Sequence, residues 1–298
     1  MKKLWISLVF ITVVLLSFGQ QTSSVIKRIN LFDYSLQAGI YGGSSTNSTQ
    51  ADFNILAPNS VLLNSNLFPN SVSFSPYYYQ RNPNSLFSAT LGFQFSDKQK
   101  TKYNKNIELR VGITYSHNSI LSGGYYDTER KTFDTLTSSQ TGVYSYLDSV
   151  VTKSLEMNYS SEQLRLDGSL IFRTNPDARW SFYSGIGITA GFSFNAKTTI
   201  VYNTQYQIEQ RMPNNHSTHL NVSGDNSQYE VFSNQNNFAF SAYIPLGINL
   251  RLGKNTEFWK KVNLFYEIRP NINITYIPEL RTVTNAFLQI GCGFRFKL

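Results

Sequence analysis

The chain has 298 residues, a formal net charge of +8, 41% hydrophobic residues and one cysteine, Cys292. A single cysteine excludes an intramolecular disulfide, so an exported form of this chain must be stabilised by other means. The basic residues are spread thinly along the sequence, which excludes the dense basic patch of a nucleic-acid-binding protein, and we expect no nucleic-acid partner.

Residues 1–19 have the composition of a secretory signal peptide. Two lysines follow Met1, residues 4–18 are apolar apart from single Ser and Thr residues, and small residues stand at the usual positions before a cleavage site. We expect cleavage to leave residues 20–31 as a periplasmic N-terminal segment and to lower the net charge to about +6. No cysteine follows the apolar stretch, which argues against a lipoprotein anchor.

The rest of the chain alternates between apolar and polar residues. No stretch reaches the roughly 18 to 20 unbroken apolar residues that a transmembrane helix needs. A period of two predicts β-strands, because successive side chains point to opposite faces of a strand. The last segment is the clearest, with an apolar face from Ala286 to Leu298 that only Phe287 breaks. The eight segments are residues 32–41, 87–95, 107–115, 164–173, 186–194, 238–251, 262–274 and 286–298.

Long and short links alternate between these segments, apart from the last link, which is short. The short links are 97–105, 175–179, 253–261 and 278–284, and the long polar links are 42–85, 120–161 and 203–237. This alternation is typical of outer-membrane β-barrels, which have short turns on the periplasmic side and long loops outside. An even number of strands would bring both termini to the periplasmic side. Strand-like runs at 125–135 and 143–151 predict a hairpin that extends beyond the bilayer.

These features predict an all-β fold, an eight-stranded antiparallel up-and-down transmembrane β-barrel over residues 32–298 with long extracellular loops. The alternative is a soluble sandwich or lipocalin-like barrel, whose strands also alternate. The polar faces favour the membrane protein, because they are rich in the small residues that suit the narrow interior of eight strands. Pro245 and Pro270 lie inside the sixth and seventh segments and are the weakest points of the strand assignment.

The signal peptide, the eight segments and the terminal strand resemble the bacterial outer-membrane β-barrel superfamily, most nearly its small OmpA/OmpX-like and PorT-like members. The resemblance implies that Phe294, Phe296 and Leu298 form the signal read by the barrel-assembly machinery. It also implies a place in the cell outer membrane, in contact with lipid and lipopolysaccharide. Members of the superfamily serve as adhesins, small pores, lipid enzymes or secretion components, so the resemblance leaves the activity open.

Eleven charged residues are expected to point into the lumen. One interpretation is a basic channel that selects anions, because basic residues outnumber acidic ones in this set. The other is a network of paired charges that fills the barrel, since a buried charge needs a partner and eight strands leave scarcely any room for water. We favour the network. Its members are Asp33, Glu108, Arg110, Arg165, Asp167, Arg173, Arg251, Glu267, Arg269, Arg295 and Lys297.

Two sets of residues could carry chemistry. His117, Ser119 and Glu129 resemble the His-x-Ser pair and later Glu of outer-membrane lipid A deacylases, in which the His acts as base for the Ser. The flanking sequence does not match further, and we predict that the protein is not an enzyme. His216 and His219 could share a metal, but no cysteine or carboxylate cluster accompanies them, so we expect no metal and no cofactor.

The sequence therefore predicts a structural, binding or assembly role through the long loops, with surface or secretion partners. A narrow anion-preferring pore, a PorT-like secretion component and a lipid A deacylase are the alternatives. Trp180 and Trp259, close to short links, are expected in an aromatic belt at the headgroup level. Tyr77, Tyr78 and Tyr79 belong to the same belt or form an adhesive patch.

Overall fold

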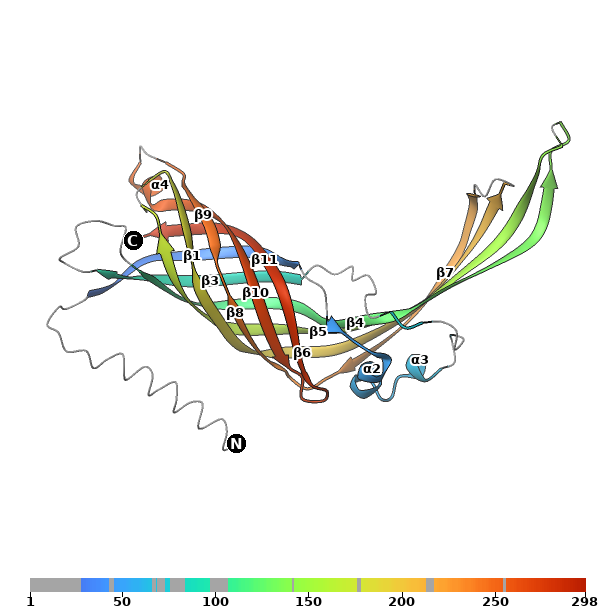
Figure 1. Ribbon diagram of the computed structural model, residues 1–298, viewed down its shortest axis with the longest axis horizontal. Coiled ribbons are helices and arrows are strands. Elements are labelled where there is room, and N and C mark those ends of the chain that lie inside the picture. The colour runs from blue at the N-terminus through green and yellow to red at the C-terminus, as the bar shows by residue number, and fades with distance from the viewer. Residues whose placement is uncertain are drawn as a thin grey trace.

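The computed structural model describes residues 28–42, 46–65, 68, 73–75, 84–96, 107–140, 142–175, 178–212, 217–253 and 256–298. Figure 1 shows two parts, a ring of strands and a long curved sheet that continues from it. The predicted signal peptide, most of the predicted periplasmic segment, Tyr77 to Tyr79 and His216 lie outside the described residues.

Eight strands pair side by side in the ring, and all neighbours are antiparallel. In ring order they are β1 (Arg28–Gly42), β3 (Asn84–Ser96), β4 (Glu108–Thr137), β5 (Tyr144–Arg173), β6 (Trp180–Arg211), then β8 (Phe238–Tyr243) with β9 (Leu246–Arg251), β10 (Val262–Tyr276) and β11 (Thr282–Lys297). β8 and β9 share one place, because both pair with β6 on one side and β10 on the other. β11 pairs back onto β1, with Leu36 opposite Phe294. All eight predicted segments are confirmed as strands of this ring.

The two prolines meet at one irregularity. The sixth predicted strand is interrupted at Ile244 and Pro245, and the facing positions on β10 are Arg269 and Pro270. There the backbone N–H of Ile244 donates to the carbonyl oxygen of Pro270 at 3.1 Å. Proline has no backbone N–H to donate to a neighbouring strand. Because both prolines lie at the same break, the pairing of the ring is interrupted at only one place.

Beyond the ring, β4, β5 and β6 continue and are joined by β7 (Ser217–Ser233) in a four-stranded sheet, which we call the arm. Figure 1 shows the arm curving away from the end of the ring that is opposite the C-terminus. The predicted hairpin at 125–135 and 143–151 is confirmed as part of the arm. Two of the three long links, predicted as loops, are largely strand instead.

A pair of β-bulges connects the ring to the arm. The register shifts at Ile120 of β4 and again at Asn195 and Ala196 of β6, where Asn195 has a positive φ of 60°. Each of these strands carries one residue more than β5 at this level, so its alternation changes phase. The inner face of the ring therefore continues as one face of the arm while its character changes from polar to apolar.

The link between β1 and β3 covers this apolar face. It contains β2 (Thr46–Asn47), α2 (Gln50–Leu56) and α3 (Val61–Asn64), and we call residues 46–65 the mouth segment. Phe53 and Leu56 pack with Leu121, Met157 and Ile200 of the arm's base in the main apolar core. Ile277, just after β10, and Val283, near the start of β11, complete this core at the rim of the ring.

Polar contacts fix the mouth segment in place. Thr49 and Asp52 form a capping box at the start of α2, and Asp52 also pairs with Arg281 at 3.0 Å. The side chain of Ser60 bonds Glu230 of β7. The mouth segment has no alternating strand pattern, so its helices were not predicted from the sequence. No helix among the described residues, including the short α4 (Glu257–Lys261), is long and apolar enough to cross a membrane.

Candidate functional site

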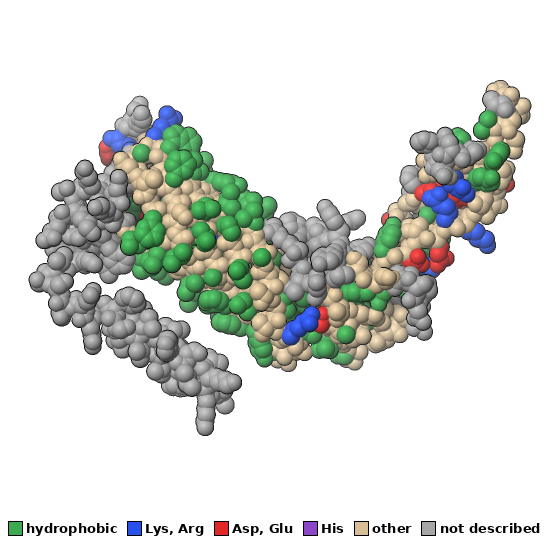
Figure 2. Space-filling model, in the orientation of Figure 1, with side chains coloured by type: hydrophobic (Ala, Val, Ile, Leu, Met, Phe, Trp, Pro, Cys, Tyr) green, Lys and Arg blue, Asp and Glu red, His purple; other side chains and the backbone are tan. Residues whose placement is uncertain are grey.

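The ring carries its apolar side chains on the outside. On β6, Phe182, Ile186 and Ile188 are each more than half exposed, whereas the alternating Thr189 and Ser193 are buried. The same division holds on the other strands, and Figure 2 shows hydrophobic side chains spread over the outer face of the ring. A soluble barrel would have the opposite arrangement, because apolar surface is driven out of water. The soluble alternative is therefore wrong for this ring.

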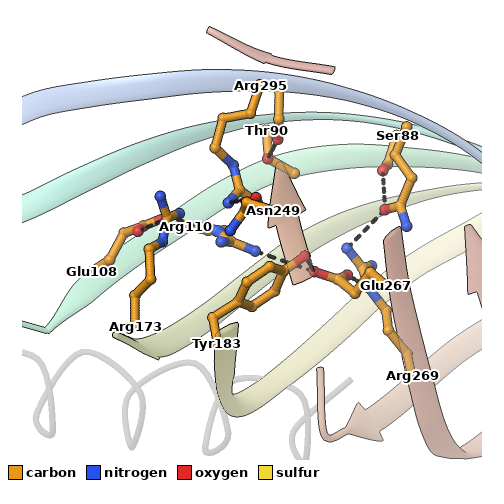
Figure 3. A network of polar contacts seen from close by, with 12 residues as sticks. Ser88, Thr90, Glu108, Arg110, Arg173, Tyr183, Asn249, Glu267, Arg269 and Arg295 are labelled. Carbon is orange, nitrogen blue, oxygen red and sulfur yellow. Dashed lines mark hydrogen bonds and ion pairs between the residues drawn. The ribbon is translucent and has the colours of Figure 1, made fainter. Parts of the chain in front are cut away.

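A network of buried charges fills the interior. Eight of the eleven predicted lumen residues are connected in it, and Figure 3 shows most of them converging from several strands. Glu108 pairs with Arg110 and with Arg173, each at 2.7 Å, and Asp33 lies 3.4 Å from Arg173 and 3.6 Å from Arg295. Each charge is thus compensated by an opposite one, as burial requires. The eight are Asp33, Glu108, Arg110, Asp167, Arg173, Glu267, Arg269 and Arg295.

Glu267 lies at the centre of this network. Its carboxylate accepts from Arg110 at 3.2 Å, from the Tyr183 hydroxyl at 2.6 Å, and from Arg269. Arg269 continues to Asp167 at 3.0 Å and to the side-chain oxygen of Gln37 at 3.0 Å. Glu267 therefore connects the two halves of the charge network.

The same arrangement of a tyrosine, a glycine, a carboxylate and an arginine occurs twice along the interior. Tyr183 and Tyr243 each face a glycine on the paired strand, Gly247 and Gly187 respectively, and a Cβ at either glycine would overlap the tyrosine ring. Each tyrosine hydroxyl bonds a buried carboxylate, Glu267 or Asp167. An arginine lies over each ring, Arg110 at 4.6 Å from the Tyr183 centroid and Arg269 at 4.9 Å from that of Tyr243. The glycines provide the space in which ring, acid and guanidinium meet.

Replacing Gly187 by Ala tests this arrangement. Because the added methyl overlaps the Tyr243 ring, we expect the free energy of unfolding to fall by about 1–3 kcal/mol. The measurement is urea unfolding in detergent, followed by the electrophoretic shift between folded and boiled protein. Gly168→Ala is the matched control, since a Cβ there meets no atom within 4 Å. Equal losses in the two variants would contradict the steric explanation.

The three other predicted lumen residues make contacts of other kinds in the described part of the chain. Arg165 is buried, but it donates to the amide oxygens of Gln163 and Asn273 and has no carboxylate among its hydrogen-bond partners in the described residues. Arg251 is half-buried near the short links, where it donates to the carbonyl oxygen of Ala178 at 3.3 Å. Lys297, also half-buried, lies 5.7 Å from the Phe32 ring centroid. The assignment of Arg165 and Arg251 to a charge-paired network is corrected accordingly.

The structure does not assemble the deacylase-like set. His117 and Glu129 are twelve positions apart on one continuous strand, β4, which separates them by about 40 Å at 3.3–3.4 Å per residue. The Ser119 hydroxyl bonds the side chain of Asn158, and Glu129 pairs with Lys153 at 2.8 Å. A triad requires mutual hydrogen bonds, so this candidate is wrong.

Of the residues of the predicted assembly signal, Phe294 and Phe296 lie on the outward face of β11, and Leu298 directly follows this strand. Phe294 and Leu298 are exposed, and Phe296 stacks on Tyr34 of β1 with ring centroids 4.9 Å apart. Phe287, which breaks the alternation, packs against Tyr41 from the opposite face. Cys292 is exposed on the outward side of the same strand.

Sequence reasoning missed the two tyrosines and the amides of the interior. Tyr183, Tyr243 and Gln37 are uncharged, so a search for charged residues passes over them. The available signal was an inward tyrosine in one segment and an inward glycine in a neighbouring one, but it becomes useful only once the register is known. For metals, no group of three or more His, Cys, Asp or Glu residues lies close enough together in the described part of the chain. The His219 side chain and His216 fall outside that part.

No protein-family model matches the chain, and no curated protein matches it. Among solved structures, Neisserial surface protein A (NspA) aligns with 91% of this chain and 100% of its own, at 10% identity and a TM-score of 0.33. Ail, the attachment invasion locus protein of Yersinia pestis, solved with the heparin analogue sucrose octasulfate, aligns with 90% of this chain and 100% of its own, at 10% identity and a TM-score of 0.23. The beta domain of the Bordetella autotransporter BrkA covers 90% and 100%, at 6% identity and a TM-score of 0.21.

All three TM-scores are below 0.5, so these likenesses define neither the fold nor the activity of this chain. Its class follows from its own architecture. Eight antiparallel strands pair in a ring, polar side chains fill the interior, and apolar side chains cover the exterior. These are the features of a β-barrel of the outer-membrane type.

Proposed function

We propose that the protein is an outer-membrane β-barrel that holds a stiff arm outside the cell and binds a surface partner through it. The observation that carries this proposal is the union of an outward-apolar ring with a sheet that continues three of its strands far beyond it. The apolar exterior fits a bilayer, whose hydrocarbon leaves no alternative to a strand ring or a helix for spanning. The short α4 between β9 and β10 and the C-terminus lie at the end opposite the arm, which fits a periplasmic location for that end, whereas the short link between β10 and β11 lies at the arm end.

The arm is braced by ion pairs. Asp148 is fully buried between Arg211 at 2.7 Å and Arg130 at 3.6 Å, and it also accepts from the Thr132 hydroxyl at 2.6 Å. Arg130 in turn pairs with Glu209 at 2.6 Å. These contacts join β4, β5 and β6 toward the far end of the arm and so help to hold its strands together there.

The far end of the arm supports a binding role. Phe133, Leu136, Val143 and Tyr144 are each more than two-fifths exposed there, although nothing in their position faces the proposed bilayer. Leu136, Val143 and Tyr144 also line a cavity of about 450 Å³ at this end. A cluster of apolar side chains that is exposed to water usually marks an interaction site.

The interior argues against the pore alternative. The charges that would attract anions are bound to one another, and the mouth segment packs over the rim at the arm end. An eight-stranded ring has an interior that side chains fill. We therefore expect no stable conductance in planar bilayers, and a steady anion current that is lost in Arg110→Gln would overturn this part of the proposal.

Three kinds of measurement test the proposal: membrane insertion, protease accessibility and partner binding. The protein should fractionate with outer membranes and migrate differently on gels with and without boiling. Protease added to intact cells should cleave in the arm while the ring remains protected. For binding, residues 133–144 would be replaced by an Asn-Gly turn, which shortens the β4–β5 hairpin and leaves the ring intact. Loss of surface partners from this variant alone is the expected result. Recovery of the same partners by both forms would refute binding through the arm.

The arm should loosen in acid. The pKa of Asp148 is lowered from its ordinary value of 3.8, mainly because the carboxylate accepts a hydrogen bond from the Arg211 side chain. A lowered pKa means that this carboxylate stabilises the arm above pH 3.8 and that the contribution is lost as the pH falls through the folded pKa. Pepsin cleavage within residues 130–150 should therefore accelerate below that pH. Asp148→Asn should be cleaved fast throughout the acidic range in which pepsin is active, whereas Asp225→Asn, at an exposed position of β7, should behave like wild type.

A further inference from the structure

Five buried nitrogen atoms of arginine side chains have no hydrogen-bond partner among the described residues. They are Nη2 of Arg110, Nε of Arg173, Nε of Arg251, and both Nε and Nη2 of Arg295. These arginines lie near strand ends at the rim of the ring opposite the arm. Arg295 is fully buried and Arg110 is 4% exposed. Buried N–H groups in folded proteins are nearly always bonded, so these five call for a further acceptor.

Three of the four arginines converge on one side chain, the ring of Tyr183. The guanidinium carbons of Arg110, Arg295 and Arg173 lie 4.6, 5.1 and 5.8 Å from its centroid. They come from β4, β11 and β5, and Figure 3 shows them meeting in the same part of the interior. The unbonded N–H groups of these three side chains are therefore gathered in one region of the ring.

Positive charge exceeds negative charge in this region. Arg251 and Arg295 face Asn263 of β10 from its two sides, and Lys297 follows Arg295 by two positions on the same strand face. Glu267, the carboxylate on the arm side, is shared with Arg269, which lies farther into the ring. The cations of the region are Arg110, Arg173, Arg251, Arg295 and Lys297, and its carboxylates are Asp33, Glu108 and the shared Glu267.

We propose that this cluster binds one phosphate-type oxyanion, with Arg110, Arg173 and Arg295 as its donors. A guanidinium carries donors only, and its planar fork suits the paired oxygens of a phosphate. A tetrahedral oxyanion offers acceptors in several directions together with the negative charge that the region lacks. A water molecule fits less well, because it accepts only two hydrogen bonds and the guanidiniums cannot accept its hydrogens.

The oxyanion would enter from the rim opposite the arm. Arg251 and Lys297 are half-buried there, and the exposed Arg179 and Lys261 add to the positive potential that draws an anion inward. On the arm side the Glu267 carboxylate closes the site with a negative charge. A bound anion is therefore held and not passed on, in agreement with the expected lack of conductance. The site depends on neither the arm nor its partner.

The test is isothermal titration calorimetry of the folded, full-length chain in detergent, with inorganic phosphate added at constant ionic strength. Wild type should bind one phosphate per chain. Arg295→Lys keeps a positive charge near Asp33 but removes the unbonded Nε and Nη2, and it should bind at least about tenfold more weakly. Arg165→Lys is the matched control and should bind like wild type. Arg165 is a buried interior arginine whose Nε and Nη1 already donate to amide oxygens.

A wild type that gives no saturable phosphate binding, or that binds chloride as tightly, would overturn the site. Equal weakening in Arg295→Lys and Arg165→Lys would show an adventitious ion only, attracted by the overall positive charge. Should Arg295→Lys fail to give the heat-dependent gel shift, Arg251→Gln takes its place, since it removes another of the five nitrogens from a half-buried position. Unchanged phosphate binding in Arg251→Gln would likewise overturn the site.

Glycerol 3-phosphate distinguishes two sources of the oxyanion. Binding as tight as that of phosphate supports a phosphate-bearing lipid headgroup that reaches over the rim, whereas its exclusion supports free phosphate. The proposed function fails separately, if the protein does not insert into membranes or if its arm binds no partner.

Discussion

Replacing Glu267 by Gln is expected to lower the free energy of unfolding of the ring by about 3 kcal/mol or more. The substitution preserves shape and removes the one charge that faces both Arg110 and Arg269. Removing one partner of a buried ion pair typically costs about 3–5 kcal/mol, because the remaining charge stays buried without compensation. The Tyr183 hydroxyl would also lose its carboxylate acceptor.

The measurement is urea unfolding in detergent, followed by the heat-dependent gel shift and by tyrosine and tryptophan fluorescence. Glu257→Gln provides the control, because this glutamate on α4 is highly exposed and pairs only with the neighbouring Lys260 among the described contacts. Exposed pairs contribute about 0–1 kcal/mol, so the control should unfold close to wild type. If both variants unfolded alike, the interior network would contribute little to stability.

Replacing Phe53 by Ala is expected to release the mouth segment while leaving the ring folded. Phe53 is completely buried among residues of the arm's base and the β10–β11 link. Truncating a buried phenylalanine to alanine typically costs about 3–5 kcal/mol, and the polar contacts of the segment, at Thr49, Asp52 and Ser60, do not replace that lost burial. The local stability of residues 48–65 should therefore fall by about this amount.

Amide hydrogen exchange resolves this effect, since α2 and α3 should lose protection while β10 and β11 keep it. Ile55→Ala is the matched control, because Ile55 lies on the same helix and is 53% exposed. Loss of the gel shift in Phe53→Ala would show that the mouth segment is required for the ring itself. That outcome would contradict the expectation that the ring folds without the mouth segment.

The strands and their order were predictable because their signal is local. An outward position in a bilayer-facing strand must be apolar and its neighbours need not be, so the alternation from Phe238 to Arg251 can be read without knowing any partner. The prolines illustrate the limit of such reading. Pro245 and Pro270 each weaken a strand in isolation, and only the pairing of β8, β9 and β10 shows that they share one break.

The interior residues show the same limit. Charges at inward positions were visible in the sequence, and eight of eleven do form the network. Which carboxylate meets which guanidinium depends on register and on distance across the ring, as for Glu267 and Arg110, which are 157 positions apart. The uncharged members, such as Tyr183 beside Gly247, depend on the register in the same way.

By itself, the sequence determined the strand periodicity, the eight strands, the alternation of short and long links and the inward location of the charges. Each of these depends on residues close together in the chain. The tertiary structure decided the arm, the mouth segment and the partners of each buried charge. The physical reason is that these features arise from contacts between distant segments, and from bulges at Ile120 and Asn195 that change the phase of the alternation.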